Sequence, residues 1–322
     1  MKYNFCTHFD INYIAHARSL HDSLVANCES FTLYMFCMCD ESFHSLKKNN
    51  YPNVVLIHFS ELESFVPELL IAKANRSMVE YFYTCSPATC YFVLNSFEDV
   101  DLITYLDADL YFFSAPDAVF SELGDKSVGM IEHRFSRFAK RNIVYGKFNV
   151  GWLNFRKDSD GMRCLKDWMD DCINWCYQRL EGDKYADQKY LDTWPVKYNN
   201  VKIIENKGAN LAFWNISNYK LKKNEDVIYV DEDRLIFYHF ANLKQIDSLL
   251  FKTDLSRVFA RTAGIVKNDI YLPYVKKLIL YKNNKPKIFA KKDAHISGIY
   301  SFIVNMTRML RDRFFPDLIE VK

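Results

Sequence analysis

Residues 102–113 have the sequence LITYLDADLYFF, in which a mainly apolar stretch leads into two aspartates and then becomes apolar again. Residues 102–106 are predicted to form a buried strand, because they lack the strict alternation of a half-exposed one. Asp107 and Asp109 would then lie at its end, where burying two carboxylates without a cation costs several kcal/mol each. A divalent ion such as Mg²⁺ or Mn²⁺ suits oxygen ligands of this kind. A solvated turn with capping aspartates is the alternative.

Strands and helices are predicted to alternate on both sides of this stretch. The expected strands are 3–7, 31–39, 54–59, 127–132, 148–155, 201–204 and 235–240. The expected helices are 11–25, a region at 68–95 that is broken near Pro87, 161–179 and 185–191, with a helical tail from Leu272. Alternation with continuously apolar strands predicts a parallel α/β sheet, and such sheets bind ligands at the carboxyl ends of their strands.

The composition excludes two familiar ways of holding phosphate. The 322 residues include only 9 glycines, and no G-x-G-x-x-G or G-x-x-x-x-G-K-[ST] motif is present. A phosphorylated ligand would have to be held by side chains, a metal or both. The 9 cysteines are an odd number and do not have the spacing of a zinc site, so free thiols in a reducing compartment are predicted. No secretory signal and no spanning segment is recognised, and we expect a cytoplasmic protein.

Four motifs stand in a characteristic order, namely YLDAD at 105–109, FNVG at 148–151, DQ at 187–188 and HF at 239–240. In these motifs the chain resembles the metal-dependent sugar-nucleotide glycosyltransferases of the GT-A fold, and most closely glycosyltransferase family 8. The resemblance extends from Tyr3 to about Lys244. It implies a GT-A type α/β catalytic domain at 1–258, with a mixed, mainly parallel sheet flanked by helices. Residues 259–322 would form a basic helical extension.

The resemblance implies how a metal ion and a diphosphate would be held. Asp107, Asp109 and His239 would bind Mn²⁺ or Mg²⁺, which neutralises the charge that develops on the leaving nucleotide. A histidine packed in the core of an apolar strand is the alternative for His239. Lys244 would meet the diphosphate, although it follows the histidine by five residues where the family has six.

The same resemblance implies a set of residues that bind the donor. Thr7 and Asp10 would lie near the uracil and ribose of a UDP-sugar, with Tyr13 near the base, and an N-cap of the next helix is the alternative for Asp10. Ala108 belongs to the D-x-D motif, and Gly151 would allow the backbone to approach the ligand. Two further candidates have plain alternatives: Arg76 as a solvated basic residue and Trp214, beside Asn210 and Asn215, as a core tryptophan.

Three residues are predicted to act at the anomeric carbon. Asn149 would lie along the donor sugar, and Asp187 and Gln188 would face the anomeric centre from the start of a helix. Family 8 members retain the anomeric configuration, so retention is favoured and the departing phosphate can act as base. Asp187 could serve as electrostatic stabiliser, nucleophile or base, and a carboxylate at a helix end is its structural alternative. His133 would line the acceptor side.

The predicted acceptor is a hydroxyl of a glycan or a lipid-linked saccharide, in bacterial surface polysaccharide or lipopolysaccharide assembly. Residues 260–322 hold 13 Lys and Arg against 5 Asp and Glu, whereas the rest of the chain is net acidic. The acidic body disfavours nucleic acid as a partner. In the tail, apolar residues at helical spacing suggest a basic amphipathic helix on an anionic membrane surface, or else a helix packed on the domain. They are Ile299, Phe302, Ile303, Met306, Leu310 and Phe314, with Arg308, Arg311 and Arg313 beside them.

Other classes of protein fit the motifs less well. A haloacid dehalogenase-type phosphohydrolase also carries D-x-D after a strand, but its motif opens the domain, and it requires Thr or Val where this chain has Tyr111. A sugar-nucleotide pyrophosphorylase needs a Gly-rich N-terminal loop that is absent from this sequence. A non-catalytic sugar-nucleotide or carbohydrate-binding relative would be free to lose the metal-binding set, which is intact here.

Overall fold

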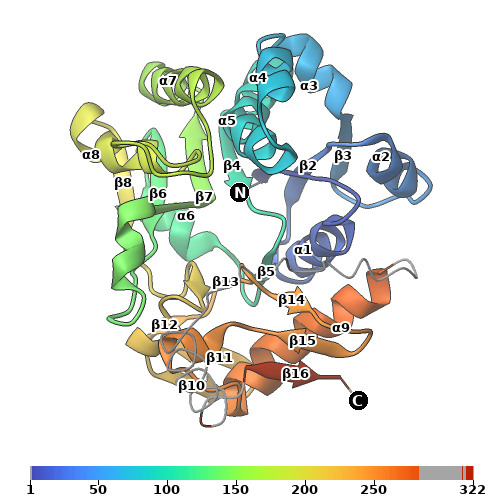
Figure 1. Cartoon of the computed structure of the whole chain (residues 1–322), viewed down its shortest axis with the longest axis vertical. Coiled ribbons are helices and arrows are strands. Elements are labelled where there is room, and N and C mark those ends of the chain that lie inside the picture. The colour runs from blue at the N-terminus through green and yellow to red at the C-terminus, as the bar shows by residue number, and fades with distance from the viewer. Residues whose placement is uncertain (1, 283–313, 315–316, 322) are drawn as a thin grey trace, which may run out of the picture.

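A seven-stranded sheet with the order β3-β2-β1-β4-β7-β6-β8 forms the centre of the protein (Figure 1). The structure is a computed structural model that describes residues 2–282, 314 and 317–321. The strands of this sheet are β1 (Tyr3–Phe9), β2 (Phe31–Cys37), β3 (Val54–His58), β4 (Leu102–Leu106), β6 (Val128–Glu132), β7 (Phe148–Arg156) and β8 (Val201–Ile204). The α-helices are α1 (Ile14–Asn27), α2 (Asp40–Lys47), α3 (Phe59–Phe65), α4 (Leu69–Asn75), α5 (Met78–Ser96), α6 (Asp117–Leu123), α7 (Ser159–Asn174), α8 (Trp194–Lys197) and α9 (Leu272–Tyr281).

The direction of the strands confirms the predicted mixed, mainly parallel sheet. β1 runs parallel to β2 and β4, β2 to β3, and β6 to β8. β7 is the exception, because it runs antiparallel to both of its neighbours, β4 and β6. The first residues of β7 therefore lie beside the end of β4, where Leu106 pairs with Trp152.

Helices cover both faces of the sheet, which explains the continuously apolar strands. Along β2, Tyr34 and Phe36 pack into the core beneath α5 and α7, whereas Leu33 and Met35 pack into the core beneath α1 and α6. Successive residues of a strand point to opposite faces. A strand that is buried on both faces therefore needs apolar residues at nearly every position.

The helical region around Pro87 differs from the prediction of a break at that residue. Pro87 lies inside α5, and the chain instead breaks between α4 and α5 at Arg76 and Ser77. Ser77 ends the break as an N-cap, since its side chain accepts a hydrogen bond from the backbone N–H of Glu80 while the Glu80 carboxylate accepts from the Ser77 N–H. This capping box satisfies backbone donors at the start of α5 and so fixes where the helix begins. α7 also ends earlier than predicted, at Asn174.

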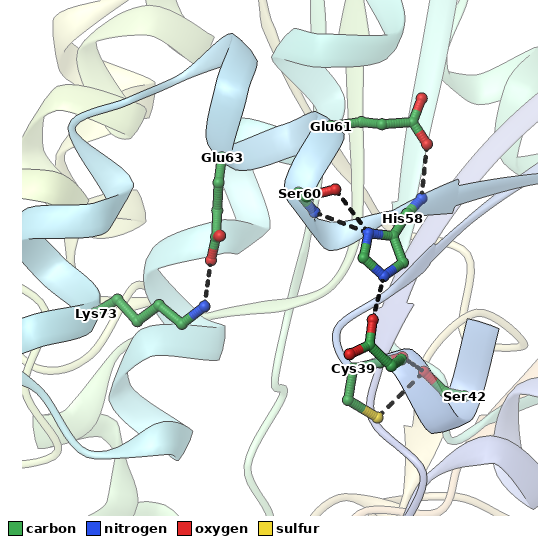
Figure 2. Close-up of polar contacts among 8 residues, drawn as sticks. Cys39, Ser42, His58, Ser60, Glu61, Glu63 and Lys73 are labelled. Carbon is green, nitrogen blue, oxygen red and sulfur yellow. Dashed lines mark hydrogen bonds and ion pairs between the residues drawn. The ribbon is translucent and has the colours of Figure 1, made fainter. Parts of the chain in front are cut away.

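A second capping box begins α3, directly after β3 (Figure 2). His58 Nδ1 accepts from the backbone N–H of Ser60, and the Glu61 carboxylate accepts from the His58 N–H at 2.9 Å. The other ring nitrogen, Nε2, lies 2.8 Å from Oδ1 of Asp40. Both ring nitrogens of His58 are therefore used locally.

The smaller sheets and α9 gather at the opposite end of the molecule from α3, α4 and α7 (Figure 1). Three sheets of three strands have the orders β10-β11-β12, β5-β13-β9 and β14-β15-β16. Their strands are β5 (Leu110–Phe112), β9 (Leu211–Ala212), β10 (Leu221–Asn224), β11 (Val227–Val230), β12 (Asp233–Arg234), β13 (Phe237–His239), β14 (Lys244–Gln245), β15 (Leu250–Lys252) and β16 (Leu318–Glu320). 3-10 helices occupy Lys140–Tyr145, Lys189–Thr193, Ile216–Asn218 and Leu255–Val258, and a π-helix at Val266–Tyr271 leads into α9.

The C-terminal elements share one apolar core with this end of the body. Phe240, Tyr274 and Ile319 all belong to it, and β16 pairs with β15. The division at residue 258 stays a prediction. Of the predicted amphipathic tail, Phe314 is described and is exposed, whereas Ile299, Phe302, Ile303, Met306, Leu310 and the three arginines lie outside the described residues. Among the helices that the structure describes, none is long and apolar enough to cross a membrane.

Candidate functional site

Three separate chain segments meet at the carboxyl end of β4. Asp107 follows β4 directly, and its backbone N–H donates to the carbonyl of Gly151 in β7 at 3.2 Å. β13 pairs antiparallel with β5, which places His239 opposite Leu110, and the N–H of Phe240 donates to the carbonyl of Asp109 at 3.0 Å. Backbone pairing therefore brings His239 to the two aspartates from more than a hundred residues away in the chain.

The side chains of these segments converge on one small volume. His239 Nε2 lies 3.1 Å from Asp109 Oδ1 and 3.4 Å from Asp107 Oδ2. One ligand atom from each of the three residues lies within 4.8 Å of the other two. His239 is 5% exposed, and Asp109 and Asp107 are 15% and 32% exposed. The cluster is thus buried at the histidine and open at Asp107.

Burial and mutual charge set the protonation of the cluster. Burial raises the pKa of Asp107 to about 6, with His239 opposing this effect and Asp109 adding to it. Burial alone would lower the pKa of His239, but the charge of Asp109 and its hydrogen bond outweigh burial, and the pKa of His239 is raised. Burial likewise works against the charged form of Asp109, yet His239 holds the pKa of Asp109 below its ordinary value.

The donor atoms fit a divalent cation. Two carboxylates and one imidazole supply oxygen and nitrogen ligands, a mixture that suits Mn²⁺. Three protein ligands also leave coordination positions for a substrate. The three residues predicted to bind metal, Asp107, Asp109 and His239, are therefore brought together in a form that could hold such an ion.

Two other predicted residues, Asn149 and Trp214, contact the ring of His239. Asn149 Oδ1 lies 3.2 Å from His239 Nδ1 and accepts the N–H of Gly151 at 3.1 Å. The indole of Trp214 meets the His239 ring edge-on, with 5.1 Å between ring centroids. β9 pairs with β13 and places Ala212 opposite His239, which explains why the tryptophan two residues further on reaches the ring.

Asp187 lies buried near the same volume. Its Oδ2 accepts a hydrogen bond from Ser86 Oγ of α5 at 2.9 Å. Burial raises the pKa of Asp187 to about 7; the Ser86 hydrogen bond opposes this shift and the charge of Asp107 adds to it. Asp187 therefore gains and loses a proton near neutral pH. The adjacent Gln188 turns elsewhere, and its Nε2 donates to the carbonyl of Tyr145 at 2.8 Å.

The N-terminal candidates lie in β1, as Thr7 does, or directly after it, as Asp10 and Tyr13 do. Thr7 is fully buried, and its Oγ1 has no hydrogen-bond partner among the described residues. Asp10 Oδ1 accepts from the N–H groups of Asn12 at 2.9 Å and Tyr13 at 3.3 Å, so it orders the turn before α1. Tyr13 is half exposed, and its ring packs on His16 at 4.8 Å between centroids. Burial, followed by the charges of Asp109 and Asp107, raises the pKa of the Tyr13 phenol.

Arg76 and Lys244 are not brought to the cluster by any described contact. The Arg76 guanidinium donates to the carbonyls of Cys172 at 2.7 Å and Ile173 at 2.5 Å, and to Thr84. These bonds tie the start of α5 to the end of α7. Lys244 is exposed in β14, where it pairs with Lys252. Ala108, between the two aspartates, is buried.

Sequence reasoning missed several residues around the site. Tyr105 donates to Asp107 Oδ1 at 3.1 Å and lies 3.3 Å from His8 Nδ1. His16 of α1 contacts Tyr274 of α9 at 2.7 Å. Tyr105 belongs to the YLDAD motif, and both Tyr105 and His8 lie in strands that end at the site, which was the signal for them. Nothing in the sequence pointed to Ser86 or Tyr274, because each reaches the site from a helix far away in the chain.

Several solved structures that resemble the chain are glycosyltransferases. Mouse xyloside xylosyltransferase 1 has a TM-score of 0.48 with 13% identity, covering 75% of this chain and 98% of that one. The galactosyltransferase LgtC has a TM-score of 0.42 with 19% identity, covering 65% and 75%. GlyE of Streptococcus pneumoniae has a TM-score of 0.42 with 15% identity, covering 66% and 47%. With TM-scores below 0.5, these likenesses carry no argument about activity. No protein-family model matches the chain.

Two curated proteins of Bacillus subtilis match in sequence. The uncharacterized protein YfnF is 29% identical over 248 residues, which cover 74% of this chain and 81% of that protein. The uncharacterized protein YfnD is 31% identical over 276 residues, which cover 85% of this chain and 88% of that protein. On that identity and coverage, the chain belongs to the same protein family as YfnD.

Proposed function

We propose that this protein is a metal-dependent glycosyltransferase that moves a hexose from a UDP-sugar to a hydroxyl of a glycan or lipid-linked acceptor. The observation that carries the proposal is the convergence of Asp107, Asp109 and His239 within 4.8 Å at the carboxyl end of β4. Ligands of parallel α/β sheets bind at this edge. The order of the motifs around these residues, which resembles glycosyltransferase family 8, supports the proposal.

Asp107, Asp109 and His239 would hold Mn²⁺ or Mg²⁺, which when bound neutralises charge on the leaving nucleoside diphosphate. The greater exposure of Asp107 leaves the open side of the cluster toward a ligand. The remaining task of the chain is to grip and orient the donor. The shortage of glycine, with 9 in 322 residues, agrees with a grip made by side chains.

The nucleoside would be held near the end of β1. The ring of Tyr13 is half exposed and offers a surface for stacking a base, and the unpartnered Thr7 hydroxyl can hydrogen-bond to a ligand. Asp10 lies beside Tyr13 in the turn that it orders. Lys244, exposed in β14, would reach the diphosphate, and Ala108 and Gly151 would leave room for it. Arg76 would affect the donor only through the packing of α5 on α7, given its bonds to α7.

Asp187 is the titratable side chain that we assign to the anomeric centre. Its pKa of about 7 lets it hold a proton in the free protein and become an anion when a cation enters nearby. As an anion it would stabilise the positive charge that develops on the sugar. Asn149 would complete this part of the site, and Gln188 would join it on releasing its hydrogen bond to the carbonyl of Tyr145. The resemblance to family 8 favours transfer with retention, in which the departing phosphate can take the acceptor proton.

The acceptor proposal extends to the basic C-terminal region. Residues 260–322 carry a surplus of Lys and Arg. Such a surplus suits an anionic lipid surface or an anionic saccharide carrier. A lipid-linked acceptor in surface polysaccharide assembly would bring such a surface to the protein. Vesicle flotation of the full chain, with and without anionic lipid, tests this part, and equal recovery from both vesicle types would reject it.

A panel of UDP-sugars, scored for UDP release with and without MnCl₂, tests the central proposal. We expect metal-dependent release with one donor or a few, and a loss of about a thousandfold in Asp109→Asn, since metal stabilisation of developing charge is worth several kcal/mol. Asp40→Asn is the matched control, because Asp40 also pairs with a histidine but lies outside the site. Full activity in Asp109→Asn would refute the proposal. Binding of a UDP-sugar without release would instead favour a non-catalytic relative.

A further inference from the structure

We propose that His133 and Asn149 form a hydrogen-bonded relay that fixes which nitrogen of His239 carries its proton, and so presents His239 Nε2 to the metal. The proposal rests on the metal site of the proposed function and adds two positioning residues to it. The relay runs from the carbonyl of Lys147 through His133 and Asn149 to His239. The resemblance assigns Asn149 to the donor sugar. In the relay, Asn149 instead accepts a hydrogen bond from His239, the histidine that would bind the metal.

The first link is set by the backbone of Gly151. Its N–H donates to Asn149 Oδ1 at 3.1 Å, which identifies this amide oxygen as the acceptor that faces β7. His239 Nδ1 lies 3.2 Å from the same oxygen. A carboxamide oxygen can only accept, so His239 Nδ1 must carry the hydrogen.

The second link follows from the other end of the amide. Asn149 Nδ2, which can only donate, lies 3.2 Å from His133 Nε2. His133 Nε2 must therefore be the bare nitrogen, and the His133 proton must sit on Nδ1. That proton has its own acceptor, because His133 Nδ1 lies 3.2 Å from the carbonyl of Lys147. Within the relay every donor thus meets an acceptor, and reversing one tautomer would set two donors or two acceptors face to face. In the neutral ring the bare Nε2 of His239 then faces the Asp109 carboxylate at 3.1 Å, and a cation between these two acceptors would satisfy both.

Burial makes the direction of this relay costly to reverse. His133, Asn149 and His239 are 5%, 6% and 4% exposed. An unpaired polar atom in such a place costs about 1–3 kcal/mol, because water does not replace the lost partner. Trp214 further restrains both rings, which it meets edge-on at 5.2 Å from His133 and 5.1 Å from His239. Phe135 stacks on the far side of His133 at 4.6 Å.

The sequence F-N-V-G gains a physical explanation from this geometry. A Cβ on Gly151 would lie 2.7 Å from Asn149 Oδ1 and 2.8 Å from His239 Cε1. Only glycine leaves room for the hydrogen bond between Asn149 and His239. β7 also bulges here, since its pairing with β6 passes from Leu153 opposite Met130 directly to Asn149 opposite Ile131. Bulges of this kind redirect side chains beside functional sites.

The consequence concerns the metal ligand. A neutral imidazole with its proton on Nδ1 has its free electron pair on Nε2, and that atom faces Asp107 and Asp109 at 3.4 and 3.1 Å. Partners that hold a ligating histidine in this way are typically worth about 10- to 100-fold in metal affinity. We assign that role to Asn149 directly and to His133 through Asn149.

Nitrogen NMR of the histidine side chains shows which ring nitrogen of His239 carries the proton, and it can be recorded on protein that holds no metal. In the metal-free protein at alkaline pH, where the ring is neutral, Asp109 offers Nε2 an acceptor at 3.1 Å and Asn149 offers Nδ1 one at 3.2 Å; we expect the relay to prevail and His239 to be protonated on Nδ1. In Asn149→Leu, which keeps the size but removes both hydrogen-bonding atoms, His239 should populate both tautomers. Protonation on Nε2 in the wild-type protein would overturn the relay, and so would an unchanged His239 spectrum in Asn149→Leu.

Titration with MnCl₂ alone, followed by electron paramagnetic resonance, measures the effect on the ligand. We expect about 10- to 100-fold weaker binding in Asn149→Leu and about 10-fold weaker binding in His133→Phe. His133→Gln should bind Mn²⁺ nearly as tightly as the wild type, because its amide oxygen can accept from Asn149 Nδ2. If the His133 ring served only for packing, His133→Phe would instead bind Mn²⁺ more tightly than His133→Gln. His58→Gln serves as the control histidine outside the site. Wild-type affinity in both Asn149→Leu and His133→Phe would overturn the proposal.

The two experiments separate the failure of the relay from that of the proposed function. If wild-type protein binds no Mn²⁺, the metal site fails, and the tautomer of His239 still decides whether the relay exists. If wild-type protein binds Mn²⁺ and the variants bind it equally well, the relay alone fails. Circular dichroism of each variant establishes that it is folded before either comparison is made.

Discussion

His58 and His239 both end an apolar strand and both lie beside an aspartate, yet the surroundings of the two rings differ. His58 is the last residue of β3 (Figure 2). Its Nδ1 caps α3 by accepting from the backbone N–H of Ser60, and its Nε2 pairs with Asp40, a carboxylate that is 69% exposed. His239 closes β13, is 5% exposed, and faces two carboxylates with a single nitrogen. Sequence neighbours supply most partners of the first ring, whereas distant segments supply those of the second.

The difference shows why a histidine beside an aspartate is not by itself a site. The partners of His58 satisfy a helix start, and solvent reaches them, so such an ion pair contributes little. The partners of His239 are like-charged and much less exposed than Asp40, at 32% for Asp107 and 15% for Asp109, so they favour a cation between them. Asp40, His58 and Ser60 also form an Asp-His-Ser series, but Nδ1 of His58, which lies 2.7 Å from Ser60 Oγ, also caps α3 by accepting from the backbone N–H of Ser60.

The largest effect is expected for His239→Ala. Loss of a direct ligand should weaken Mn²⁺ binding by at least about 100-fold, since loss of an outer partner alone costs about 10- to 100-fold. Isothermal titration calorimetry with MnCl₂ measures it. His58→Ala is the matched substitution and should bind Mn²⁺ as the wild type does. Equal loss in the two variants would abolish the contrast between the two histidines.

Asp187→Asn is expected to have an intermediate effect that depends on pH. The pKa of Asp187 is raised to about 7 in the folded protein, so its contribution to stability is complete below the unfolded pKa of 3.8 and is lost as pH rises through 7. Asn cannot ionise and keeps an acceptor for Ser86. The metal-free variant should therefore be more stable than wild type at pH 8 by on the order of 1–3 kcal/mol, with little difference at pH 4.

Urea unfolding at the two pH values measures this difference. Asp40→Asn is the control for the substitution itself, because the Asp40 carboxylate is mainly surrounded by solvent. The same change in stability at pH 4 and pH 8 for Asp187→Asn would contradict the assignment of a buried carboxyl that resists ionisation.

The smallest effect is expected for stability in His58→Ala. The side chain accepts from the N–H of Ser60, and loss of such an N-cap costs about 1 kcal/mol. Thermal unfolding, compared with His44→Ala on the exposed surface of α2, measures it. A loss of stability in His58→Ala no larger than that in His44→Ala would show that the cap does not stabilise the protein. The two histidines would then differ even more than the structure indicates.

Much of the fold was predictable from apolar patterning. β4 and β8 have the predicted bounds, and most other strands end within one or two residues of them. The position of the break at Ser77 was not predicted, because the break was expected at Pro87 and the capping box of Ser77 and Glu80 was not recognised. The reversed direction of β7 also lies beyond local pattern, since a fully buried strand is apolar whichever way it runs.

By itself, the sequence determined that Asp107 and Asp109 leave a buried strand together, because two carboxylates at the end of an apolar run have to meet water or a cation. It also supplied, by resemblance, His239 and Asn149 as their companions. Only the tertiary structure placed His239 against both aspartates, and it alone revealed Ser86 and the link through His133. Strand pairing across more than a hundred residues selects these neighbours, and that pairing depends on hydrogen bonds and burial that no local stretch of sequence contains.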